Sequence, residues 1–286
     1  MALVPDPRPQ SLSGTPATIL RLTGADALAI LHRISTQSVV DLEPGSCRVT
    51  LFCDFRGRLL HRAAVARVRD GAVWLVREDA PAEELAAHLD RHIFRENVRV
   101  EEDAAHRGGV RAVPGGFGLA AGTVVEQGGA PFRLEIGPSF GLEVGERSSD
   151  PDAERLRILA GRPRHGHEIA PAFNPFEVGL AHEVHLDKGC FTGQEALLRL
   201  VTYGGVRRRL AIVTGTGGAP GVPRDILDRG KVAGVLTSAA GAGPGWSGLA
   251  VIRNEALDGP PALEVAGAGP VGPPQVFPAT RPAGLR

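Results

Sequence analysis

The stretch "LDKGCFTGQEALLR", residues 186–199, places a cysteine in a glycine-rich turn directly before an apolar run with helical spacing. Gly189 and Gly193 allow backbone conformations that other residues resist, and the run from Gln194 onward predicts a helix. The N–H groups at the start of that helix would point back into the turn, which suits an anion or a thiolate. Two interpretations stay open: Cys190 is a working thiol, or the stretch is a tight turn that holds a small apolar side chain.

The side chains around Cys190 bear on that choice. Lys188 lies two residues before the cysteine and would lower the pKa of its thiol if the two groups are close together. Gln194 and Glu195 offer a donor and acceptors to an amide-like heterocycle. Arg199 lies four residues after Glu195, a spacing that also predicts a plain ion pair along the helix. The local chemistry favours a functional loop without requiring one.

The composition narrows the class of protein. Lys plus Arg equals Asp plus Glu at 32 each, so the bulk charge gives no reason to expect binding to nucleic acid or to an acidic membrane. The three cysteines form no CxxC pair and cannot all pair, which disfavours a disulfide scaffold and indicates a reducing compartment. No apolar run reaches the length of a membrane span, and the first residues lack the features of a secretory leader. We therefore expect a cytoplasmic protein.

Upstream of the turn, helix and strand patterns alternate. A strand that begins near residue 17 leads to Thr23, a predicted helix N-cap, and three apolar strands follow over 47–78 with turns at "DFRG" and "RDG". A second helix pattern covers 81–93, and a strand over 97–103 follows it. Helices that alternate with antiparallel strands predict an α+β fold.

Three domains are expected along the chain. Residues 1–107 form an N-terminal α+β subdomain, and residues 108–204 form a second α+β subdomain, with a helix over 151–160, that carries the cysteine turn. After Gly205 the pattern changes to strands separated by Gly/Pro loops, which suits a small β-barrel or a sandwich, and we expect a β-barrel over 205–286.

Histidines cluster near the cysteine turn. Four of the nine lie between residues 165 and 185, and "HEVH" at 182–185 is one residue short of the zincin spacing. Histidines three residues apart can still face one way, so the pattern does not exclude zinc, although exposed polar residues of a loop region give the same pattern. We assign no metal ligand from it.

The segment "KGCFTGQEALLR" resembles the K-G-C-F/Y-x-G-Q-E-x-x-x-R signature of the YgfZ family of folate-binding proteins, relatives of the glycine-cleavage T-protein, an aminomethyltransferase. The residues that match are Lys188, Gly189, Cys190, Phe191, Gly193, Gln194, Glu195 and Arg199. The likeness extends over most of the chain, from "GADALAILHRISTQSVVDLEPG" at 24–45 to "GKVAGVLTSA" at 230–239. It implies a three-part T-protein-like fold around a central channel that holds tetrahydrofolate or a one-carbon derivative. It also implies a role in assembly, maturation or repair of 4Fe–4S proteins.

Departures from the T-protein pattern narrow the expected chemistry. T-proteins carry an acidic pair, one aspartate of which is catalytic, where this chain has His61 and Arg62. A T-protein glutamate and tyrosine are replaced by Leu159 and His165. Without the aspartate, a neutral amine has no carboxylate to orient and activate it. An ordinary aminomethyltransferase is therefore not expected, whereas Glu177 matches a T-protein glutamate in register and is the expected pterin contact.

The leading hypothesis is a tetrahydrofolate-binding accessory protein for iron–sulfur proteins. Its partners are folate and iron–sulfur assembly or client proteins, and a single cysteine would need a partner's thiolates to hold a cluster. Cys190 is the expected working thiol and Lys188 its electrostatic partner. The expected cofactor-binding residues are Glu177, Gly189, Gly193, Gln194, Glu195 and Arg199. Two alternatives stay open: a folate-dependent aminomethyl- or methyltransferase, acting on a small amine or on tRNA, and a folate-binding scaffold whose cysteine is structural.

Overall fold

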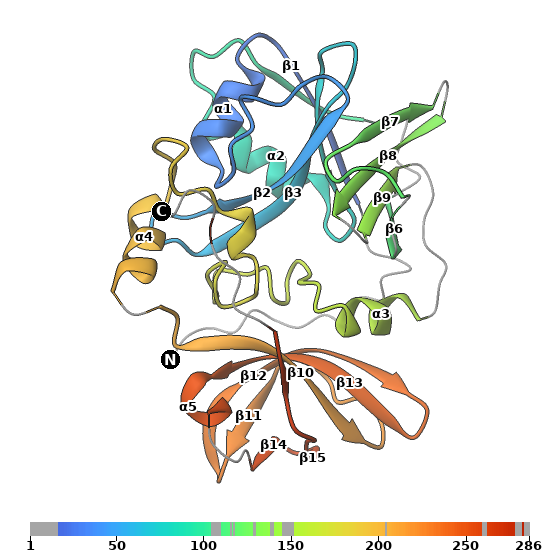
Figure 1. Cartoon of the computed structure of the whole chain (residues 1–286), viewed down its shortest axis with the longest axis vertical. Coiled ribbons are helices and arrows are strands. Elements are labelled where there is room, and N and C mark those ends of the chain that lie inside the picture. The colour runs from blue at the N-terminus through green and yellow to red at the C-terminus, as the bar shows by residue number, and fades with distance from the viewer. Residues whose placement is uncertain are drawn as a thin grey trace.

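The described residues of a computed structural model form three antiparallel sheets with short helices (Figure 1). The description covers residues 17–103, 110–114, 116, 118–127, 130–137, 140–144, 152–203, 205–258, 262–277 and 282. The mixed helix and strand content agrees with the expected α+β class.

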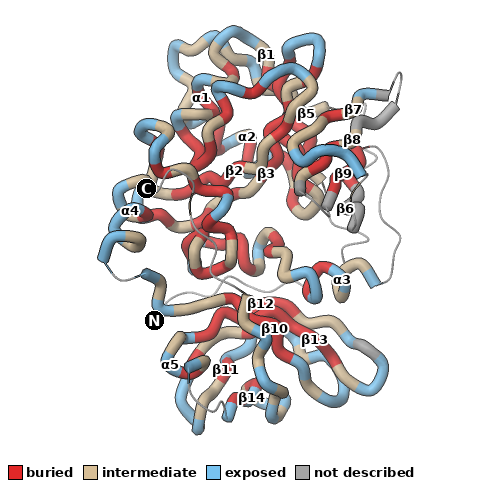
Figure 2. Tube along the Cα trace, viewed as in Figure 1, coloured by how far each residue is buried: buried red, intermediate tan, exposed pale blue. Residues whose placement is uncertain are grey.

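The first sheet has five strands in the order β2-β3-β4-β1-β5. Its strands are β1 (Thr18–Thr23), β2 (Ser46–Cys53), β3 (Leu59–Arg67), β4 (Val73–Arg77) and β5 (Arg99–Glu102). One face packs on α1 (Ala27–Ile34) and α2 (Ala82–Asp90) through a core that includes Phe52, Ala63 and Val65. Figure 2 shows these central strands as mostly buried. The predicted meander over 47–78 is confirmed as β2, β3 and β4.

The opposite face of the first sheet packs on a four-stranded sheet in the order β6-β9-β8-β7. Its strands are β6 (Val110–Pro114), β7 (Val124–Gln127), β8 (Ala130–Gly137) and β9 (Phe140–Val144). Side chains alternate along β3, so Ala64 and Ala66 face this second core while Ala63 and Val65 face the helices. The first sheet is therefore covered on both faces.

The middle of the chain, 152–203, has little regular structure. It contains α3 (Ala153–Leu159), the short 3-10 helix η3 (Ala181–Glu183) and α4 (Gln194–Thr202). Buried side chains of the turns between them, such as Phe173 and Val178, share one core with Leu249 and Val251 of the last sheet. No helix of the described chain is long and apolar enough to cross a membrane.

The last sheet has seven strands in the order β15-β14-β11-β12-β13-β10-β16. Its elements are β10 (Arg208–Thr216), β11 (Arg224–Asp228), β12 (Lys231–Ala242), β13 (Gly245–Arg253), α5 (Asn254–Leu257), β14 (Leu263–Val265), β15 (Gly269–Pro270) and β16 (Gln275–Val276). In the described chain the sheet is a half-barrel, so the predicted closed C-terminal barrel is wrong. Its edge strands have two residues each and lie among Pro270, Pro273 and Pro274, which lack the N–H groups that closure would need.

A β-bulge in β12 connects the last sheet to the middle segment. The pairing with β13 shifts between Leu236 and Ser238, so Thr237 is an extra residue. The hydroxyls of Thr237 and Ser238 both donate to Oε1 of the buried Glu168, the latter at 2.7 Å. Oε2 of Glu168 accepts from Arg157 of α3 at 3.3 Å. This buried ion pair and its hydroxyl partners join α3 to β12.

Two predicted helix boundaries are wrong. Thr23 ends β1 instead of capping α1, because Gly24 (φ +110°) turns the chain and the helix begins after Asp26. The carboxylate of Asp26 instead accepts the N–H of Asn97 at 2.7 Å. The second helix ends at Asp90, so Ile93 lies beyond it. Both errors arise where a turn interrupts an apolar pattern that continues through it.

Candidate functional site

The loop over 186–193 holds Cys190 at the surface. The Cys190 side chain is exposed, whereas the next residue, Phe191, is buried. His32 of α1 donates from Nε2 to the carbonyl of Lys188 at 2.9 Å, and the Lys188 ammonium donates to the carbonyl of His32. Burial lowers the pKa of Lys188 to about 8, and its Nζ lies 5.0 Å from the Phe191 ring centroid. The contacts of Lys188 thus fix the loop on α1.

The other side of this loop packs on the turn between β2 and β3. Gly193 has φ +85°, and a Cβ atom there would lie 2.5 Å from the carbonyl oxygen of Asp54. Gly189 has φ +104°, and a Cβ atom there would meet open space. Gln194 donates from Nε2 to the carbonyl of Leu186 at 2.9 Å, which closes the loop on itself. The exposed thiol therefore stands on a well-anchored turn directly before α4.

The remaining predicted site residues already have partners within the chain. Glu195 and Arg199 form an exposed ion pair at 2.6 Å along α4. The carboxylate of Glu177 is buried, accepts from Nε and Nη2 of Arg208 at 2.8 and 3.0 Å, and accepts the N–H of Asn174 at 3.1 Å. These contacts are structural, and a role in cofactor binding stays a prediction for these residues.

The other two cysteines are buried. Cys47 lies in the core between the first two sheets, where burial, with a smaller effect of Glu135, raises the pKa of its thiol to about 12. Burial likewise raises the pKa of Cys53 well above its usual range. Of the three cysteines only Cys190 is exposed, so it is the thiol that a reagent or a partner can reach.

His61 lies on β3 in a buried group of rings. Its ring is stacked on that of His165 with centroids 5.4 Å apart, and it meets His88 edge-on at 5.3 Å. Burial, together with the charge of Arg77, lowers the pKa of His61 to about 2. The position at which the T-protein resemblance places part of an acidic pair thus holds a neutral imidazole.

Arg77, the last residue of β4, hydrogen-bonds both stacked histidines. It donates to Nδ1 of His61 at 3.3 Å, to Nε2 of His165 at 3.0 Å and to Thr18 at 2.7 Å. Ligand atoms of His61, Glu84 and His165 come within 4.8 Å of one another, a spacing that suits a metal ion. Arginine is a donor only, so the two ring nitrogens that face Arg77 accept its hydrogen bonds. Sequence reasoning missed this group because its members are far apart in the chain.

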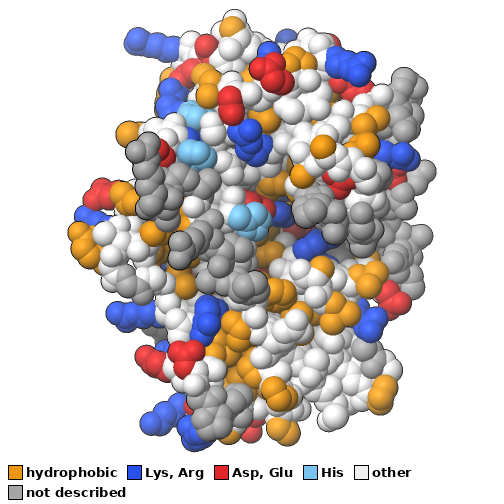
Figure 3. Space-filling model, in the orientation of Figure 1, with side chains coloured by type: hydrophobic (Ala, Val, Ile, Leu, Met, Phe, Trp, Pro, Cys, Tyr) orange, Lys and Arg blue, Asp and Glu red, His pale blue; other side chains and the backbone are white. Residues whose placement is uncertain are grey.

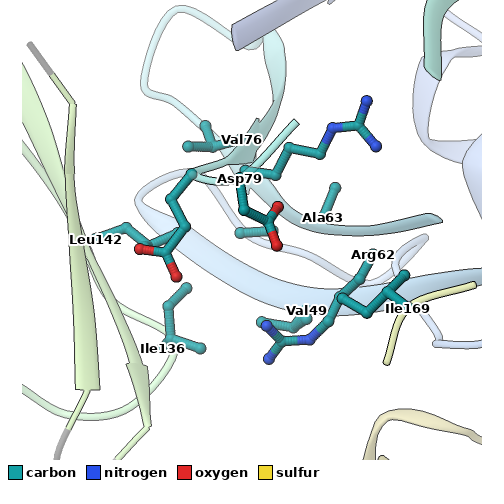
Figure 4. Close-up of a pocket in the computed structure, with 11 residues that line it drawn as sticks. Val49, Arg62, Ala63, Val76, Asp79, Ile136, Leu142 and Ile169 are labelled. Carbon is teal, nitrogen blue, oxygen red and sulfur yellow. The ribbon is translucent and has the colours of Figure 1, made fainter. Parts of the chain in front are cut away.

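A hollow opens where β3 and β4 meet the four-stranded sheet (Figure 4). We call it the β3–β4 hollow. Its polar walls come from the ends of β3 and β4, and its apolar walls come from both sheets and the middle segment. The lining residues are Val49, Arg62, Ala63, Ala64, Val76, Arg77, Glu78, Asp79, Ile136, Leu142 and Ile169. Cys190 is not among them, so the exposed thiol and the hollow are separate features.

Arg62 and Asp79 are each anchored on one side. Arg62 donates from Nε and Nη2 to the buried carboxylate of Glu183 at 2.8 and 2.6 Å. Asp79 accepts the backbone N–H of His165 through Oδ2 at 2.8 Å. Figure 4 shows both side chains at the hollow, Arg62 from β3 and Asp79 from the segment that follows β4. Sequence reasoning found Arg62 only as a departure from a motif and missed Asp79.

Glu78 and Asp79 are neighbours whose pKa values shift in opposite directions. Burial raises the pKa of Glu78, and its ion pair with Arg162 offsets only part of that effect. Burial by itself would also raise the pKa of Asp79, but His165, Arg77 and Arg62 lower it, and the net shift is downward. The hollow thus holds an ionised carboxylate beside one that retains its proton more readily.

Three comparisons relate this geometry to known proteins. Residues 16–111 match the family described as the GCVT N-terminal domain. The crystal structure of glycine cleavage system aminomethyltransferase T from Bartonella henselae aligns with 93% of this chain and 86% of its own, with a TM-score of 0.72 and 18% identity. The chain has the aminomethyltransferase T fold. At that identity the likeness establishes the fold alone.

Proteins of similar sequence match shorter stretches of this chain. A putative chloroplastic transferase of Arabidopsis thaliana is 41% identical over 106 residues, 36% of this chain and 24% of that protein. The aminomethyltransferase of Moorella thermoacetica is 41% identical over 88 residues, 30% and 23% of the two chains. That of Streptomyces avermitilis is 23% identical over 265 residues, 77% and 71%.

The chain spans about a quarter of the length of the first two relatives. These matches therefore support T-protein-like ancestry of the fold and leave the reaction to be proposed. The narrower resemblance to the YgfZ family stays a prediction.

Proposed function

We propose that the chain binds a reduced folate and serves as an accessory protein in the assembly, maturation or repair of 4Fe–4S proteins, with Cys190 as its working thiol. The observation that carries the proposal is the exposure of Cys190 on a loop anchored to α1 and to the β2–β3 turn, while Cys47 and Cys53 are buried. A thiol held in this way is accessible to a protein partner and does not line the β3–β4 hollow.

The buried side of the site argues against ordinary aminomethyl transfer. General-base activation of an amine requires an accessible group with a pKa near the working pH. His61 is buried with a pKa near 2, and Arg62 is bound to Glu183. Neither residue supplies the carboxylate that the T-protein pattern has at these positions.

The β3–β4 hollow offers polar groups but little room. Its empty space is about 360 Å³ when the part open to solvent is included, and the enclosed part holds about one water molecule. Asp79 and Arg62 provide an acceptor and a donor beside apolar walls. A bound tetrahydrofolate would supply a carrier for a one-carbon group. We assign the ring no contact inside the hollow, because the hollow is too small for it.

Iron–sulfur chemistry suits a surface thiol. Thiolate is the usual ligand of iron in such clusters, and a complete 4Fe–4S cluster takes four thiolates. The chain offers one accessible thiol, so any cluster it contacts would be held mainly by a partner's cysteines. We therefore assign Cys190 a transient contact with the cluster or with a partner's thiol, and we assign Lys188 the task of holding the loop.

The test compares Cys190→Ala with Thr192→Ala, a control in the same loop, in cells that lack the protein. Wild type and Thr192→Ala should restore the activity of 4Fe–4S enzymes, whereas Cys190→Ala should not. All three purified proteins should bind a reduced folate with a micromolar Kd, about 8 kcal/mol, by calorimetry. Full rescue by Cys190→Ala would overturn the role of the thiol, and absence of folate binding by wild type would overturn the folate part.

A folate-dependent transferase is the second candidate. The observation in its favour is the pair Glu78 and Asp79, because opposite pKa shifts in neighbouring carboxylates are typical of an acid–base pair. Turnover of methylenetetrahydrofolate with a glycine-cleavage carrier protein or with tRNA, lost in Glu78→Gln, would favour this candidate over the accessory role.

A further inference from the structure

We infer that the turn between β2 and β3, together with α4, is a docking surface for a protein partner that presents a cysteine among acidic and apolar side chains. We call it the Phe55–α4 surface, and its members are Phe55, Arg56, Arg58, Leu198 and Tyr203. The inference rests on the proposed function, in which Cys190 meets the cysteines of a partner. It adds the place where that partner docks and the chemistry of the segment that it presents.

The turn, the cysteine loop and α4 are in contact with one another (Figure 1). A Cβ atom on Gly193 would lie 2.5 Å from the carbonyl oxygen of Asp54, and a Cβ atom on Gly57 would lie 3.0 Å from the side chain of Leu197. Cys190 is exposed and precedes Gly193 in the same loop. A partner that reaches the thiol therefore also meets the turn and α4.

Large apolar side chains are exposed on this surface. Phe55 in the turn is 73% exposed, Leu198 on α4 is 42% exposed, and Tyr203, the C-cap of α4, is 84% exposed. Removal of such side chains from water favours association. Aromatic and arginine side chains carry much of the binding energy at protein interfaces, and the surface offers both types.

The backbone of the turn holds Phe55 in a fixed position. Oδ1 of Asp54 accepts the N–H groups of Arg56 and Arg58, each at 2.8 Å, and the N–H of Asp54 donates to the carbonyl of Arg58 at 2.9 Å. The Arg56 guanidinium lies 5.1 Å from the centroid of the Phe55 ring. Because the turn is already ordered, little conformational entropy is lost when a partner covers the ring.

The exposed charges of the turn are positive. The carboxylate of Asp54 is engaged by backbone N–H groups, whereas Arg56 is exposed and makes no ion pair within the described residues. The Arg58 side chain is 41% exposed, and it shares the buried carboxylate of Glu177 with Arg208, so two guanidinium groups face one carboxylate. The turn is therefore complementary to acidic side chains.

The other charges near Cys190 balance one another. Glu195 and Arg199 form an ion pair along α4, and Asp187 and Lys188 are neighbours of opposite charge. The positive excess thus belongs to the turn. We therefore expect the acidic residues of the partner beside its cysteine, on the side that faces the turn.

A second Phe–Arg turn in the chain provides a matched control. Phe94 is 82% exposed, and Oε2 of Glu96 accepts the N–H groups of Phe94 and Arg95 at 2.8 and 3.0 Å. This turn follows α2 and makes no hydrogen bond to the cysteine loop in the part of the chain that the structure describes. It presents the same two side chains without the contacts to Gly193 and α4 that the turn at 54–57 makes.

The test measures how fast Cys190 forms a mixed disulfide with two short peptides of equal length. Each peptide has one cysteine, activated as its 2-pyridyl disulfide and flanked by leucines, with glutamates in one peptide and lysines in the other. The Cys190 thiolate attacks the peptide sulfur, and the pyridine-2-thione that leaves is measured by its absorbance. Each rate is divided by that of the same peptide with 2-mercaptoethanol, and Cys190→Ala gives the background from the buried cysteines.

Wild type should react about 3-fold or more faster with the acidic peptide at low salt, and high salt should remove the difference. Arg56→Glu should reverse the preference, whereas Arg95→Glu should keep it. Phe55→Ser should slow the reaction of both peptides about 3-fold or more, and Phe94→Ser should not. All four side chains are exposed, so the variants should fold as wild type does. Equal rates of wild type with the two peptides, or equal effects of the two turns, would overturn this inference.

The same variants in cells that lack the protein separate this inference from the proposed function. Phe55→Ser and Arg56→Glu should restore the activity of 4Fe–4S enzymes poorly, whereas Phe94→Ser and Arg95→Glu should restore it fully. Full rescue by Phe55→Ser and Arg56→Glu would overturn the docking surface and leave the role of Cys190 standing. Full rescue by Cys190→Ala would overturn the role of the thiol, and the peptide rates would still support or overturn the surface.

A second copy of the chain is the other occupant that the test distinguishes. Sedimentation of wild type at increasing concentration should show a monomer throughout. A dimer that is lost in Phe55→Ser and kept in Phe94→Ser would assign the surface to self-association and overturn the inference.

Discussion

The Cys190 loop and the histidines around His61 lie near the same end of β2 and β3, yet their physical settings are opposite. The loop rests on the turn at 54–57, and its thiol is exposed. His61 lies a few residues further along the chain, on β3, and its ring is buried against His88 and His165. The exposed thiol of Cys190 and the buried ring of His61 therefore both lie close to the turn that connects β2 and β3.

This difference shows how the fold distributes chemical reactivity. Burial lowers the pKa of the histidines and raises that of the buried cysteines, so each is held in its neutral form. The Cys190 side chain is exposed, although the next residue, Phe191, is buried. Charges of both signs are interspersed over the face seen in Figure 3.

The largest expected difference is between the alkylation rates of the exposed and the buried thiols. Cys190 should react with iodoacetamide roughly 1,000-fold faster than Cys47 and Cys53, since an opening that costs about 4 kcal/mol exposes a buried thiol about one part in a thousand of the time. A mass-spectrometric time course resolves the three sites. In urea the three rates should converge. Similar rates in the native protein would show that the three thiols do not differ in access.

The buried histidines should make the free energy of unfolding depend on pH. The pKa of His61 is about 2 and those of His88 and His165 are about 4, against 6.5 in the unfolded chain. As pH falls below 6.5, the unfolded chain binds protons that the folded chain does not. Stability is therefore complete above pH 6.5 and is lost as pH falls toward 4, by up to about 1.4 kcal/mol per pH unit for each histidine. Urea unfolding between pH 7 and pH 5 measures this slope.

Two glutamine variants test whether the buried histidines cause the slope of unfolding free energy against pH. His88→Gln should make it shallower by up to one proton, because one buried histidine no longer titrates. His182→Gln, the same substitution at an exposed histidine outside the cluster, is the matched control. An unchanged slope in His88→Gln would contradict the assignment.

The smallest expected effect concerns the two glycines of the cysteine loop. Gly189→Ala should cost roughly 1–2 kcal/mol in free energy of unfolding, the cost of a left-handed backbone alone. Gly193→Ala should cost more, because its Cβ would also press on the carbonyl of Asp54. Urea unfolding of the pair measures the difference. Equal losses would mean that the loop yields at Gly193 and is less firmly held than its contacts indicate.

Local patterns predicted the elements that depend on neighbours in the chain. The meander of β2, β3 and β4 follows from alternation and turn residues, and the glycine turn before α4 follows from its composition. The ion pair of Glu195 and Arg199 follows from helical spacing. Each of these features is set within a few residues, so the sequence alone indicates it.

Features set by tertiary contacts could not be predicted in this way. Asp79 enters the hollow because β4 ends beside His165, which is 86 residues away, and Arg77 hydrogen-bonds imidazoles from two segments. Closure of the last sheet depended on edge strands whose length no local pattern gives. Glu177 fitted a motif, yet its partner Arg208 lies on β10 of the last sheet, 31 residues away. In each case the deciding neighbour is distant in the chain.

The bulge at Thr237 changes the phase of β12. Before it, Val235 packs toward the middle segment and Leu236 toward the interior of the last sheet. After it, Ala239 faces that interior and Ala240 faces the middle segment, so the parity of inward residues is reversed. Deleting Thr237 would restore regular alternation and send Ala239 and Ala240 to the wrong sides, and the same deletion would remove a hydroxyl from Glu168. The number of residues in this strand therefore matters by itself, because the loss of one residue would exchange the two faces of all residues after it, whatever their side chains.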